Sequence, residues 1–127
     1  MNFNIRAYKQ SDYEILSSWW RGWSWPLVPK ECLPQTGYII DDLCAGFLYK
    51  TDSSIAWMEW IISNPKADKF VRGEALDVLI VSLIEKAKEQ GFSSIFTSSN
   101  KLSFKDRLIK HKFIETDKDV SQFIRSL

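Results

Sequence analysis

The chain has few cysteines and no run of apolar residues long enough to cross a membrane. Cys32 and Cys44 are the only two cysteines in 127 residues, and their spacing is not typical of metal ligands. They exclude a disulfide framework and favour free thiols in a reducing compartment. No stretch reaches the roughly 20 apolar residues of a membrane-spanning helix. The residues that follow Met1 lack the basic-then-apolar pattern of a signal peptide. We therefore expect a cytoplasmic protein with no membrane partner and no metal.

The chain also has no large excess of positive or of negative charge. The 17 basic and 16 acidic side chains leave a net charge of +1. Broad, salt-dependent binding of nucleic acid usually requires a basic surface, so we expect no nucleic-acid partner. What the chain does contain is apolar material, at 45% of residues, which is enough for a sizeable core. The length indicates a single domain over residues 1–127.

The first third of the chain predicts a strand, a helix and a break. Apolar and polar residues alternate over 3–7, as in a half-buried strand. Ser11 and Glu14 have the spacing of a capping box, which predicts a helix that begins near Asp12. One face of that helix carries large apolar side chains, namely Leu16, Trp19, Trp20 and Trp23. Pro26 and Pro29 end regular structure, apart from a possible short helix before the next strand.

The middle of the chain predicts an antiparallel meander. Residues 36–41 and 43–51 read as strands joined by a tight turn at Asp41-Asp42. A second turn at 51–54 leads into a third strand over 55–63. We expect these three strands to be neighbours in one sheet.

The last half predicts a crossover followed by more strands. Apolar residues recur at helical spacing over 74–90, with Glu74 at the helix start and Gly91 at its C′ position. A strand over 92–97 follows and should run parallel to the strand over 55–63. Ser103 with Asp106 predicts a short helix that bears Phe104, Leu108 and Ile109. Residues 113–115 and 120–124 read as two final strands. The order is β-α-(short helix)-β-β-β-α-β-α-β-β, an α/β arrangement with a mixed sheet.

The stretch from Trp57 to Gly91 carries the best indication of a ligand. A strand leads through a loop into a helix, and the first N–H groups of a helix lack intrahelical partners and attract anions. Gly73 and Ala75 have small side chains, so a pyrophosphate such as that of coenzyme A could approach. We expect the Glu74 side chain to point into solvent. Its negative charge would be offset by Lys66, Lys69 and Arg72. The alternative is that Gly73 only eases entry into the helix.

The element order together with the loop resembles the GNAT superfamily of acetyl-CoA-dependent N-acetyltransferases. The family loop reads Arg/Gln-x-x-Gly-x-Gly/Ala, and Phe70-Val71-Arg72-Gly73-Glu74-Ala75 aligns with it, with Phe70 in place of the first basic or amide residue. Asn100 matches an Asn that often ends the next strand. Phe113 matches a Phe that opens the sixth strand, although Lys112 replaces the usual Gly. Leu108 stands where the family usually has a Tyr.

This resemblance implies an α/β (α+β) fold with a mixed, mostly antiparallel sheet of six to seven strands, flanked by about four helices. It also implies acetyl-CoA as cosubstrate, with the pantetheine arm along the end of the strand over 55–63, where this strand splays from the next. The implied cofactor-binding residues are Ile61, Ile62, Ser63, Lys69, Val71, Arg72, Gly73, Glu74, Ala75 and Asn100.

Glu59 is the candidate general base. An ammonium acceptor must lose a proton before it attacks a thioester, and a carboxylate can take that proton. Carboxyl groups among aromatic side chains tend to have raised pKa values, which suits a base near neutral pH. The position of Glu59 relative to Gly73 resembles that of the catalytic glutamate in histone-type members of the family. The alternative is a solvent-facing strand glutamate, because Glu59 alternates with Trp57 and Ile61 on one face, opposite Met58, Trp60 and Ile62.

The acid that protonates the leaving thiolate is not identified. Leu108 cannot donate a proton, which leaves water, Ser98, Ser99 or Tyr49 as substitutes. His111, the single histidine, is interpreted as a surface residue.

Tryptophans gather in residues 19–25 and suggest an acceptor wall. In the fold that the resemblance implies, the first helices border the acceptor site, and aromatic faces bind amines by cation–π contact. Trp23 and Trp25 are the candidate substrate-binding residues, although all four tryptophans could instead be core. The predicted function is transfer of an acetyl group to an amine on a small molecule or protein, by a monomer or homodimer. The alternative is a non-catalytic acyl-CoA-fold module that binds a partner protein through this Trp-rich surface.

Overall fold

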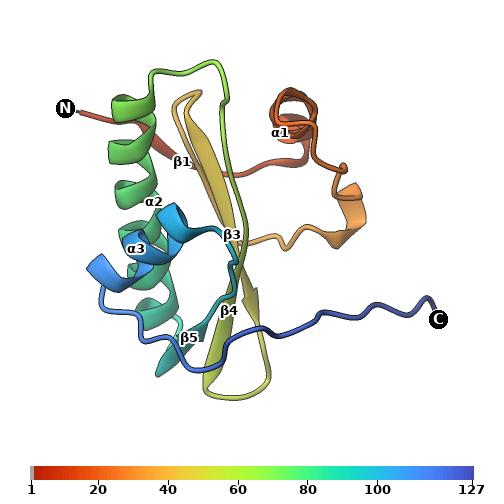
Figure 1. Ribbon diagram of the computed structural model, residues 1–127, viewed down its shortest axis with the longest axis vertical. Helices are drawn as coiled ribbons and strands as arrows, with labels where there is room; N and C mark the ends of the chain where they lie inside the picture. The colour runs from red at the N-terminus through yellow and green to blue at the C-terminus, as the bar shows by residue number, and fades with distance from the viewer. Residues whose placement is uncertain (1) are drawn as a thin grey trace.

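A central sheet lies between helices on both of its faces (Figure 1). The structure, a computed structural model, describes residues 2–127. Its strands are β1 (Ile5–Ala7), β2 (Gly37–Ile40), β3 (Cys44–Lys50), β4 (Ile55–Ser63) and β5 (Ser94–Phe96). Its α-helices are α1 (Tyr13–Gly22), α2 (Lys69–Glu89) and α3 (Leu102–Lys110), with short 3-10 turns η1 (Gln10–Asp12) and η2 (Lys30–Cys32). Helix α1 covers one face of the sheet, and α2 and α3 cover the other (Figure 1).

The strands lie in the sheet in the order in which they occur in the chain. Neighbours from β1 to β4 are antiparallel, and β4 and β5 are parallel, joined by the α2 crossover. The predicted meander is therefore confirmed, and so is the parallel pair.

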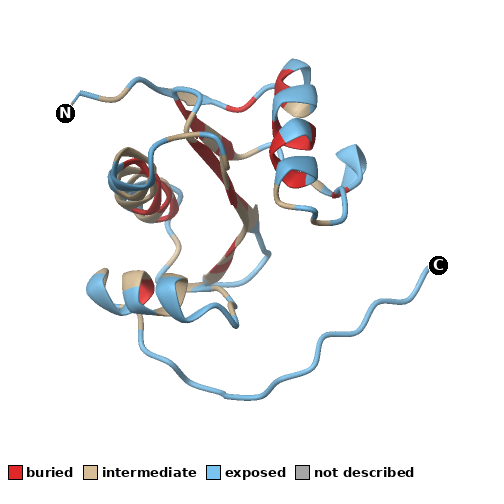
Figure 2. Ribbon diagram, turned by 45° about the horizontal axis from the view of Figure 1, so that its top comes forward, coloured by how far each residue is buried: buried red, intermediate tan, exposed pale blue. Residues whose placement is uncertain are grey.

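Two clusters of buried residues form the core, one on each face of the sheet. Figure 2 colours the buried parts of the ribbon red. On the α2 face, Leu48 and Met58 pack against Leu79 and Leu83 of the helix. The α1 face buries a second, aromatic cluster, whose members include Leu16, Trp19, Trp20, Ile39, Phe47 and Ile62. Trp19 and Trp20 are therefore core residues, whereas Trp23 and Trp25 are only partly buried.

The start of α1 is organised by Asp12 and not by the predicted capping box. The Asp12 carboxylate accepts hydrogen bonds from the Lys9 N–H at 2.8 Å and from both terminal nitrogens of Arg6 at 2.8 and 2.7 Å. No cap from Ser11 forms. The hydrogen bond from Arg6, against the opposing effect of burial, lowers the pKa of Asp12. The helix begins close to the predicted residue, but a charge pair with β1 fixes it there.

Helix α2 begins at Lys69, five residues before the predicted start at Glu74. Asp68 caps it, because its carboxylate accepts from the N–H groups of Phe70 and Val71, both at 3.1 Å. The predicted end is confirmed. Gly91 has a φ of +87° at C′, a left-handed backbone that suits glycine, and the Phe92 N–H closes the helix end on Ala87 O at 3.0 Å.

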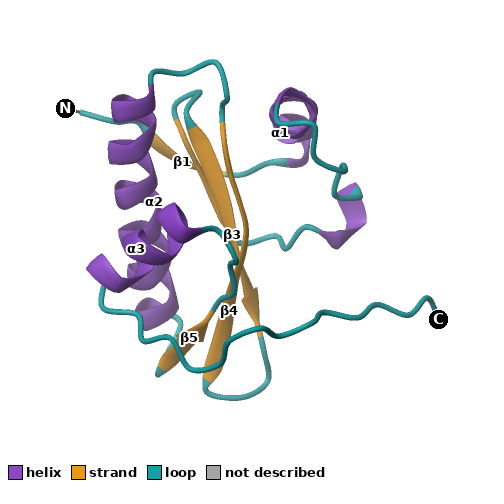
Figure 3. Ribbon diagram, viewed as in Figure 1, coloured by secondary structure: helices purple, strands orange, loops and turns teal. Residues whose placement is uncertain are grey.

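The predicted sheet of six to seven strands and the predicted four helices are not confirmed. Residues 2–127 form five strands and three α-helices (Figure 3). The two strands predicted at 113–115 and 120–124 are wrong for this structure, because the sheet ends at β5 and nothing pairs with them. Helix α3 is present as predicted, but without a side-chain cap at its start.

Candidate functional site

The parallel pair of strands separates soon after it begins. β4 and β5 pair only from Ile55–Ser94 to Trp57–Phe96. The Thr97 hydroxyl then donates to Met58 O at 2.8 Å, and beyond that point β5 has ended while β4 continues to Ser63. On the β5 side, the backbone of residues 59–63 therefore has no neighbouring strand within the described part of the chain. An extended ligand arm could pair with this edge.

A β-bulge lies in the same segment of β4. The pairing with β3 passes from Phe47–Glu59 to Ala45–Ile62, so that Gly46 alone lies opposite Trp60 and Ile61. Trp60 has a φ of 58°, a left-handed backbone conformation that bulky residues rarely adopt. Strained backbone of this kind is concentrated at functional sites.

The bulge changes which side chains share a face of β4. The face alternation that we predicted holds only up to Glu59. Beyond it, Ile61 packs on the α2 side and Ile62 on the α1 side. Glu59 pairs across the strands with Phe47, a member of the α1-side cluster, so it lies on the α1 face. Trp60 also packs on that face, next to Glu59.

One indole N–H and one backbone N–H hold the Glu59 carboxylate. The Trp57 indole N–H donates to Glu59 Oε2 at 2.9 Å, and the Trp60 backbone N–H donates to Oε1 at 3.4 Å. The Trp60 indole N–H donates to the Tyr49 hydroxyl at 2.8 Å, and that hydroxyl donates to Cys32 O. The half-buried carboxylate is thus oriented beside the open edge of β4. A carboxylate held in this way can accept a proton.

The first turn of α2 lies directly after the β4–α2 loop and already binds one anionic group. The Asp68 carboxylate occupies the N–H groups of Phe70 and Val71, and Val71 is one of the predicted cofactor-binding residues. Lys69 is exposed at the first position of the helix. Arg72 Nη1 donates to Ala67 O at 3.0 Å and tethers the loop. These N–H groups are suited to an anion, which would have to displace Asp68.

Gly73 and Ala75 lie in the second turn, away from the free N–H groups. The space next to Gly73 holds the Arg107 guanidinium, and a Cβ built on Gly73 would lie 3.2 Å from Arg107 Nη2. Arg107 Nη1 also donates to Gly73 O at 2.8 Å. Ala75 is fully buried against the sheet, whereas Glu74 is exposed as expected. The small residues here serve helix packing, and Arg107 adds a cation beside the loop.

A row of two stacked aromatic rings with a cation at each end crosses the end of β4. The Arg72 guanidinium lies 5.3 Å from the Trp23 ring, Trp23 stacks on Trp25 at 5.6 Å, and Lys101 Nζ lies 3.3 Å from the Trp25 ring centre. The Trp23 indole N–H donates to Ser63 O at 2.7 Å. Burial lowers the pKa of Lys101. This row joins the start of α2, through Arg72, to the segment between β5 and α3, through Lys101.

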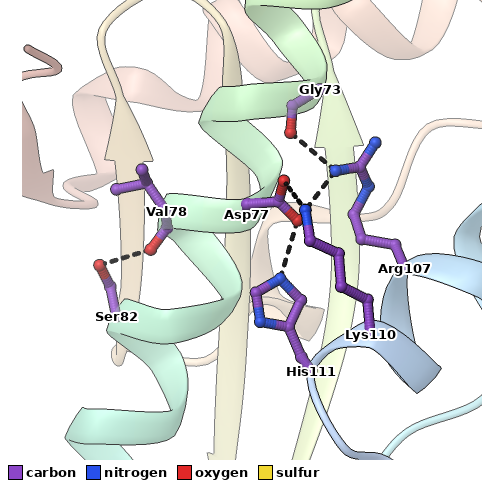
Figure 4. A network of polar contacts seen from close by, with 7 residues as sticks. All are labelled: Gly73, Asp77, Val78, Ser82, Arg107, Lys110 and His111. Atoms are coloured by element: carbon purple, nitrogen blue, oxygen red, sulfur yellow. Dashed lines mark hydrogen bonds and ion pairs between the residues drawn. The ribbon is translucent and has the colours of Figure 1, made fainter. Parts of the chain in front are cut away.

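An ion cluster fastens α3 to α2 (Figure 4). Asp77 of α2 contacts Arg107 at 2.9 Å, Lys110 at 2.9 Å and His111 Nε2 at 2.8 Å. The prediction of His111 as a surface residue is wrong, because its side chain is only 14% exposed and bonded to Asp77. The cluster holds Arg107 in its position beside Gly73.

The remaining candidates are spread around these features. Asn100 is exposed between β5 and α3, and Leu108 is buried in the α2-side core.

Cys32 and Cys44 are free thiols, and burial raises the pKa of Cys44 to about 12. Two shallow hollows of about 210 and 270 Å³ share Pro34 and Gln35, and the second is also lined by Tyr49, one of the candidate substitute acids. Within residues 2–127, no cluster of side chains could hold a metal ion, and no helix could span a membrane.

Sequence reasoning missed Arg107, Lys101 and the bulge at Trp60. Arg107 and Lys101 reach the site across 34 or more residues of intervening chain, from Gly73 and Trp25 respectively, and no local pattern reveals such contacts. The bulge had one detectable indication. Residues 57–62 carry large apolar side chains at almost every position, which an exact alternation does not explain.

Comparison with known proteins establishes the fold. No family model and no curated protein sequence matches the chain. Solved structures do match over nearly its whole length. A Trypanosoma brucei acetyltransferase is 14% identical with a TM-score of 0.69, covering 97% of this chain and 100% of its own. A Staphylococcus aureus acetyltransferase of the GNAT family is 13% identical with a TM-score of 0.66, covering 99% and 94%.

A third similar structure carries a ligand. It is a Mycobacterium tuberculosis protein in complex with CoA, 14% identical with a TM-score of 0.69, covering 93% of this chain and 76% of its own. At identities this low the likeness concerns the fold alone. The chain has the GNAT acetyltransferase fold, as the resemblance implied.

Proposed function

We propose that this GNAT-fold chain transfers an acetyl group from acetyl-CoA to an amine. The observation that carries the proposal is the early separation of β4 and β5, which leaves residues 59–63 with an open backbone edge. The bulge at Trp60 and the oriented Glu59 carboxylate lie on this same segment. The CoA bound by the Mycobacterium tuberculosis protein of the same fold adds support.

Acetyl-CoA fits the residues around α2 in part. Its pantetheine arm would run along residues 60–63, between Ile61, Ile62 and Ser63 on one side and Asn100 on the other. Its pyrophosphate would replace the Asp68 carboxylate at the first turn, near Lys69, Val71 and Arg72. Gly73, Glu74 and Ala75 belong to the same segment, but the buried Ala75 supports the helix and not the ligand. Arg107 supplies a positive charge beside Gly73.

The proposed reaction is direct acyl transfer. The lone pair of the amine attacks the thioester carbonyl carbon, the new C–N bond forms, and the C–S bond breaks with release of coenzyme A. Before that attack, Glu59 accepts a proton from the ammonium form of the acceptor, directly or through water, and so frees the lone pair of the amine. Leu108 is buried and apolar, so the proton for the departing thiolate would come from water or from one of Ser98, Ser99 and Tyr49.

The acceptor side is proposed to include Trp23 and Trp25. The Trp25 ring contacts two neighbours, the stacked Trp23 ring and the Lys101 ammonium. An ammonium acceptor, on a small molecule or on a protein, would take the position of the Lys101 ammonium on that ring.

Ligand binding is the first test, read as the thermal midpoint of unfolding with and without 1 mM coenzyme A. We expect a rise, since a ligand at about 100 times its Kd stabilises by about 2.7 kcal/mol. Asp68→Asn keeps a capping side chain but removes the competing charge, so it should bind coenzyme A more tightly than the parent. Lys69→Glu should bind more weakly. Lys88→Glu, the same charge reversal at the far end of α2, is the matched control. Absence of any shift in all variants would contradict the proposal.

Catalysis is the second test, read as release of free thiol from acetyl-CoA in the presence of a panel of amines. Glu59→Gln keeps an oxygen that can accept from Trp57. It should lower kcat by about 10²- to 10⁴-fold, the usual contribution of a general base, with the coenzyme A midpoint shift unchanged. Unchanged turnover across the pH range would remove Glu59 from the mechanism.

Two observations favour a second candidate function, a non-catalytic module that binds a partner protein through residues 19–25. Leu108 provides no proton donor near the site, and Asp68 fills the anion position. This module would show no thiol release with any amine, in the parent and in Glu59→Gln alike.

A further inference from the structure

Lys101, the residue before α3, differs from its neighbours in what its ammonium group contacts. Lys105, one turn further on, binds the Glu115 carboxylate at 3.0 Å. The Lys101 Nζ instead lies 3.3 Å from the centre of the Trp25 ring and forms no salt bridge within residues 2–127. A ring face attracts an ammonium group but offers no carboxylate to keep it charged. The Lys101 ammonium can therefore lose a proton without breaking an ion pair.

The backbone on both sides of this contact is fixed by hydrogen bonds. The Lys101 N–H donates to Ser99 Oγ at 3.1 Å, and Lys101 O accepts from the Lys105 N–H at 2.9 Å. Across the contact, the Trp25 N–H donates to Trp20 O at 2.9 Å. The amine is thus held in one place on the ring, with little freedom in the chain on either side.

That place lies beside the path proposed for the cofactor. Lys101 directly follows Asn100, which the pantetheine arm would contact. The Trp23 indole N–H donates to the last residue of β4 at 2.7 Å, and Trp23 stacks on Trp25. Trp25 packs against the α1-side cluster, and Glu59 lies on the same face of the sheet. The ring that holds the amine and the proposed base are therefore on one side of the open edge of β4.

The environment of Lys101 also favours the reactive form of its amine. The residue as a whole is exposed, so a bound acyl donor and water can reach it. Partial desolvation nevertheless lowers the pKa of Lys101 below its ordinary value. A larger fraction of this amine is neutral near pH 7 than for a lysine in water, and only the neutral amine has the lone pair that attacks a thioester.

We propose that the chain acetylates its own Lys101, whose amine occupies the acceptor position on the Trp25 ring. The proposal rests on the proposed acetyl transfer and names one acceptor for it. The ammonium group gives one proton to Glu59 or to water. The amine then attacks the thioester carbonyl carbon, so that the N–C bond forms and the C–S bond breaks. The nitrogen loses a second proton, which balances the proton that the coenzyme A thiolate takes up.

The product is an uncharged acetamide at residue 101. An acetamide has no charge for the ring to attract, so the cation–π contact with Trp25 ends. The ring then becomes available to the ammonium group of an external acceptor. Self-acetylation would in this way precede transfer to other amines.

Site-resolved mass spectrometry is the direct test. The full chain is incubated with acetyl-CoA that carries carbon-13 in the acetyl group, and the label on each lysine is followed by peptide mapping. Lys101 should be labelled about 10-fold faster than Lys50, or more, because a positioned amine reacts as if at high local concentration. Lys50 is the matched reference, since it is exposed and forms no salt bridge within the part of the chain that the structure describes. Equal labelling of the two lysines overturns the proposal.

Dilution and competition test whether transfer occurs within one chain from the bound cofactor. With acetyl-CoA in excess, the first-order rate constant of Lys101 labelling should not change on hundredfold dilution of the protein. A rate constant that falls in proportion means that one copy acetylates another, which overturns self-transfer. Excess coenzyme A should slow the labelling of Lys101 and not that of Lys50. A preference for Lys101 that survives this competition reflects chemical reactivity alone and overturns the proposal.

Trp25→Leu tests the role of the ring. It keeps an apolar side chain but removes the aromatic face, and it should slow Lys101 labelling by about 2- to 30-fold, the range of a cation–π contact. The matched control is Phe92→Leu, which removes a partly buried ring on the α2 side of the sheet and should be labelled like the parent. Undiminished labelling of Lys101 in Trp25→Leu overturns the assignment of the ring as its holder.

The coenzyme A midpoint shift, measured for the parent and each variant, separates this proposal from the proposed function. A shift in the parent without fast labelling of Lys101 overturns self-acetylation alone and leaves cofactor binding intact. No shift and no labelling in the parent overturn both. A shift that is retained in Trp25→Leu, together with slower labelling, shows that the variant is folded and that the ring acts on the amine.

Discussion

At the scale of single residues, Trp60 decides the geometry of the candidate site. It is the additional residue of the bulge, and its left-handed backbone allows Glu59 and Trp60 to face α1 together. Without it, strict alternation would point Trp60 towards α2. The Trp60 N–H also contacts the Glu59 carboxylate, so the strained residue helps to orient the proposed base.

The strain at Trp60 predicts an inverted order of stability between two small substitutions. Within a strand, a protein with glycine is usually less stable than the same protein with alanine, by roughly 0.5–1 kcal/mol. At a φ of 58° the left-handed backbone instead destabilises the alanine variant by about 1–2 kcal/mol, and it does not destabilise the glycine variant. Trp60→Gly should therefore unfold at a higher urea concentration than Trp60→Ala, by about 1 kcal/mol in free energy.

Trp57 provides the control for this comparison. It lies in the same strand, half-buried, and its backbone is not left-handed. Trp57→Ala should be more stable than Trp57→Gly in the same urea titration. If alanine is the more stable substitution at both positions, the bulge is not centred on Trp60.

At the scale of elements, the position of α3 depends on one carboxylate of α2. Burial alone would raise the pKa of Asp77, but hydrogen bonds from His111, Lys110 and Arg107 outweigh it and lower the pKa to about 2. The side chain is 23% exposed, so screening by water is limited. Asp77 thereby fixes Arg107 beside Gly73 and joins the last helix to the site (Figure 4).

This arrangement predicts a loss of stability in acid. The folded-state pKa of Asp77, about 2, lies below the ordinary value of 3.8. The stabilisation is therefore complete above about pH 4 and disappears as the pH falls towards 2, with a size of about 2 kcal/mol. Asp77→Asn should be less stable than the parent by about that amount at pH 6 and nearly equal to it at pH 2, as measured by urea unfolding.

Asp52→Asn is the matched control for the acid prediction. It removes the same charge from an exposed turn outside the ion cluster. A gap between parent and Asp77→Asn that stays constant from pH 6 to pH 2 would show that the Asp77 cluster does not titrate as a stabilising unit.

Element boundaries were predictable where the pattern is local and apolar, and less so where a polar side chain sets them. β4 has the predicted bounds, because its flanking turns and apolar run agree. The start of α2 was placed too late because Gly73 read as loop, whereas the Asp68 carboxylate initiates the helix five residues earlier. The contacts of Arg107 and Lys101 with the site come from packing between distant elements, which periodicity does not encode.

At the scale of the whole molecule, the sequence predicted the order of elements through α3 and then failed. Residues 120–124 have the composition of a strand, but a strand exists only when another strand pairs with it. Within residues 2–127, the edge of β5 and the stretch over 113–127 both stay unpaired. The prediction failed because the apolar pattern of residues 120–124 is local, whereas the pairing that would complete a strand is not.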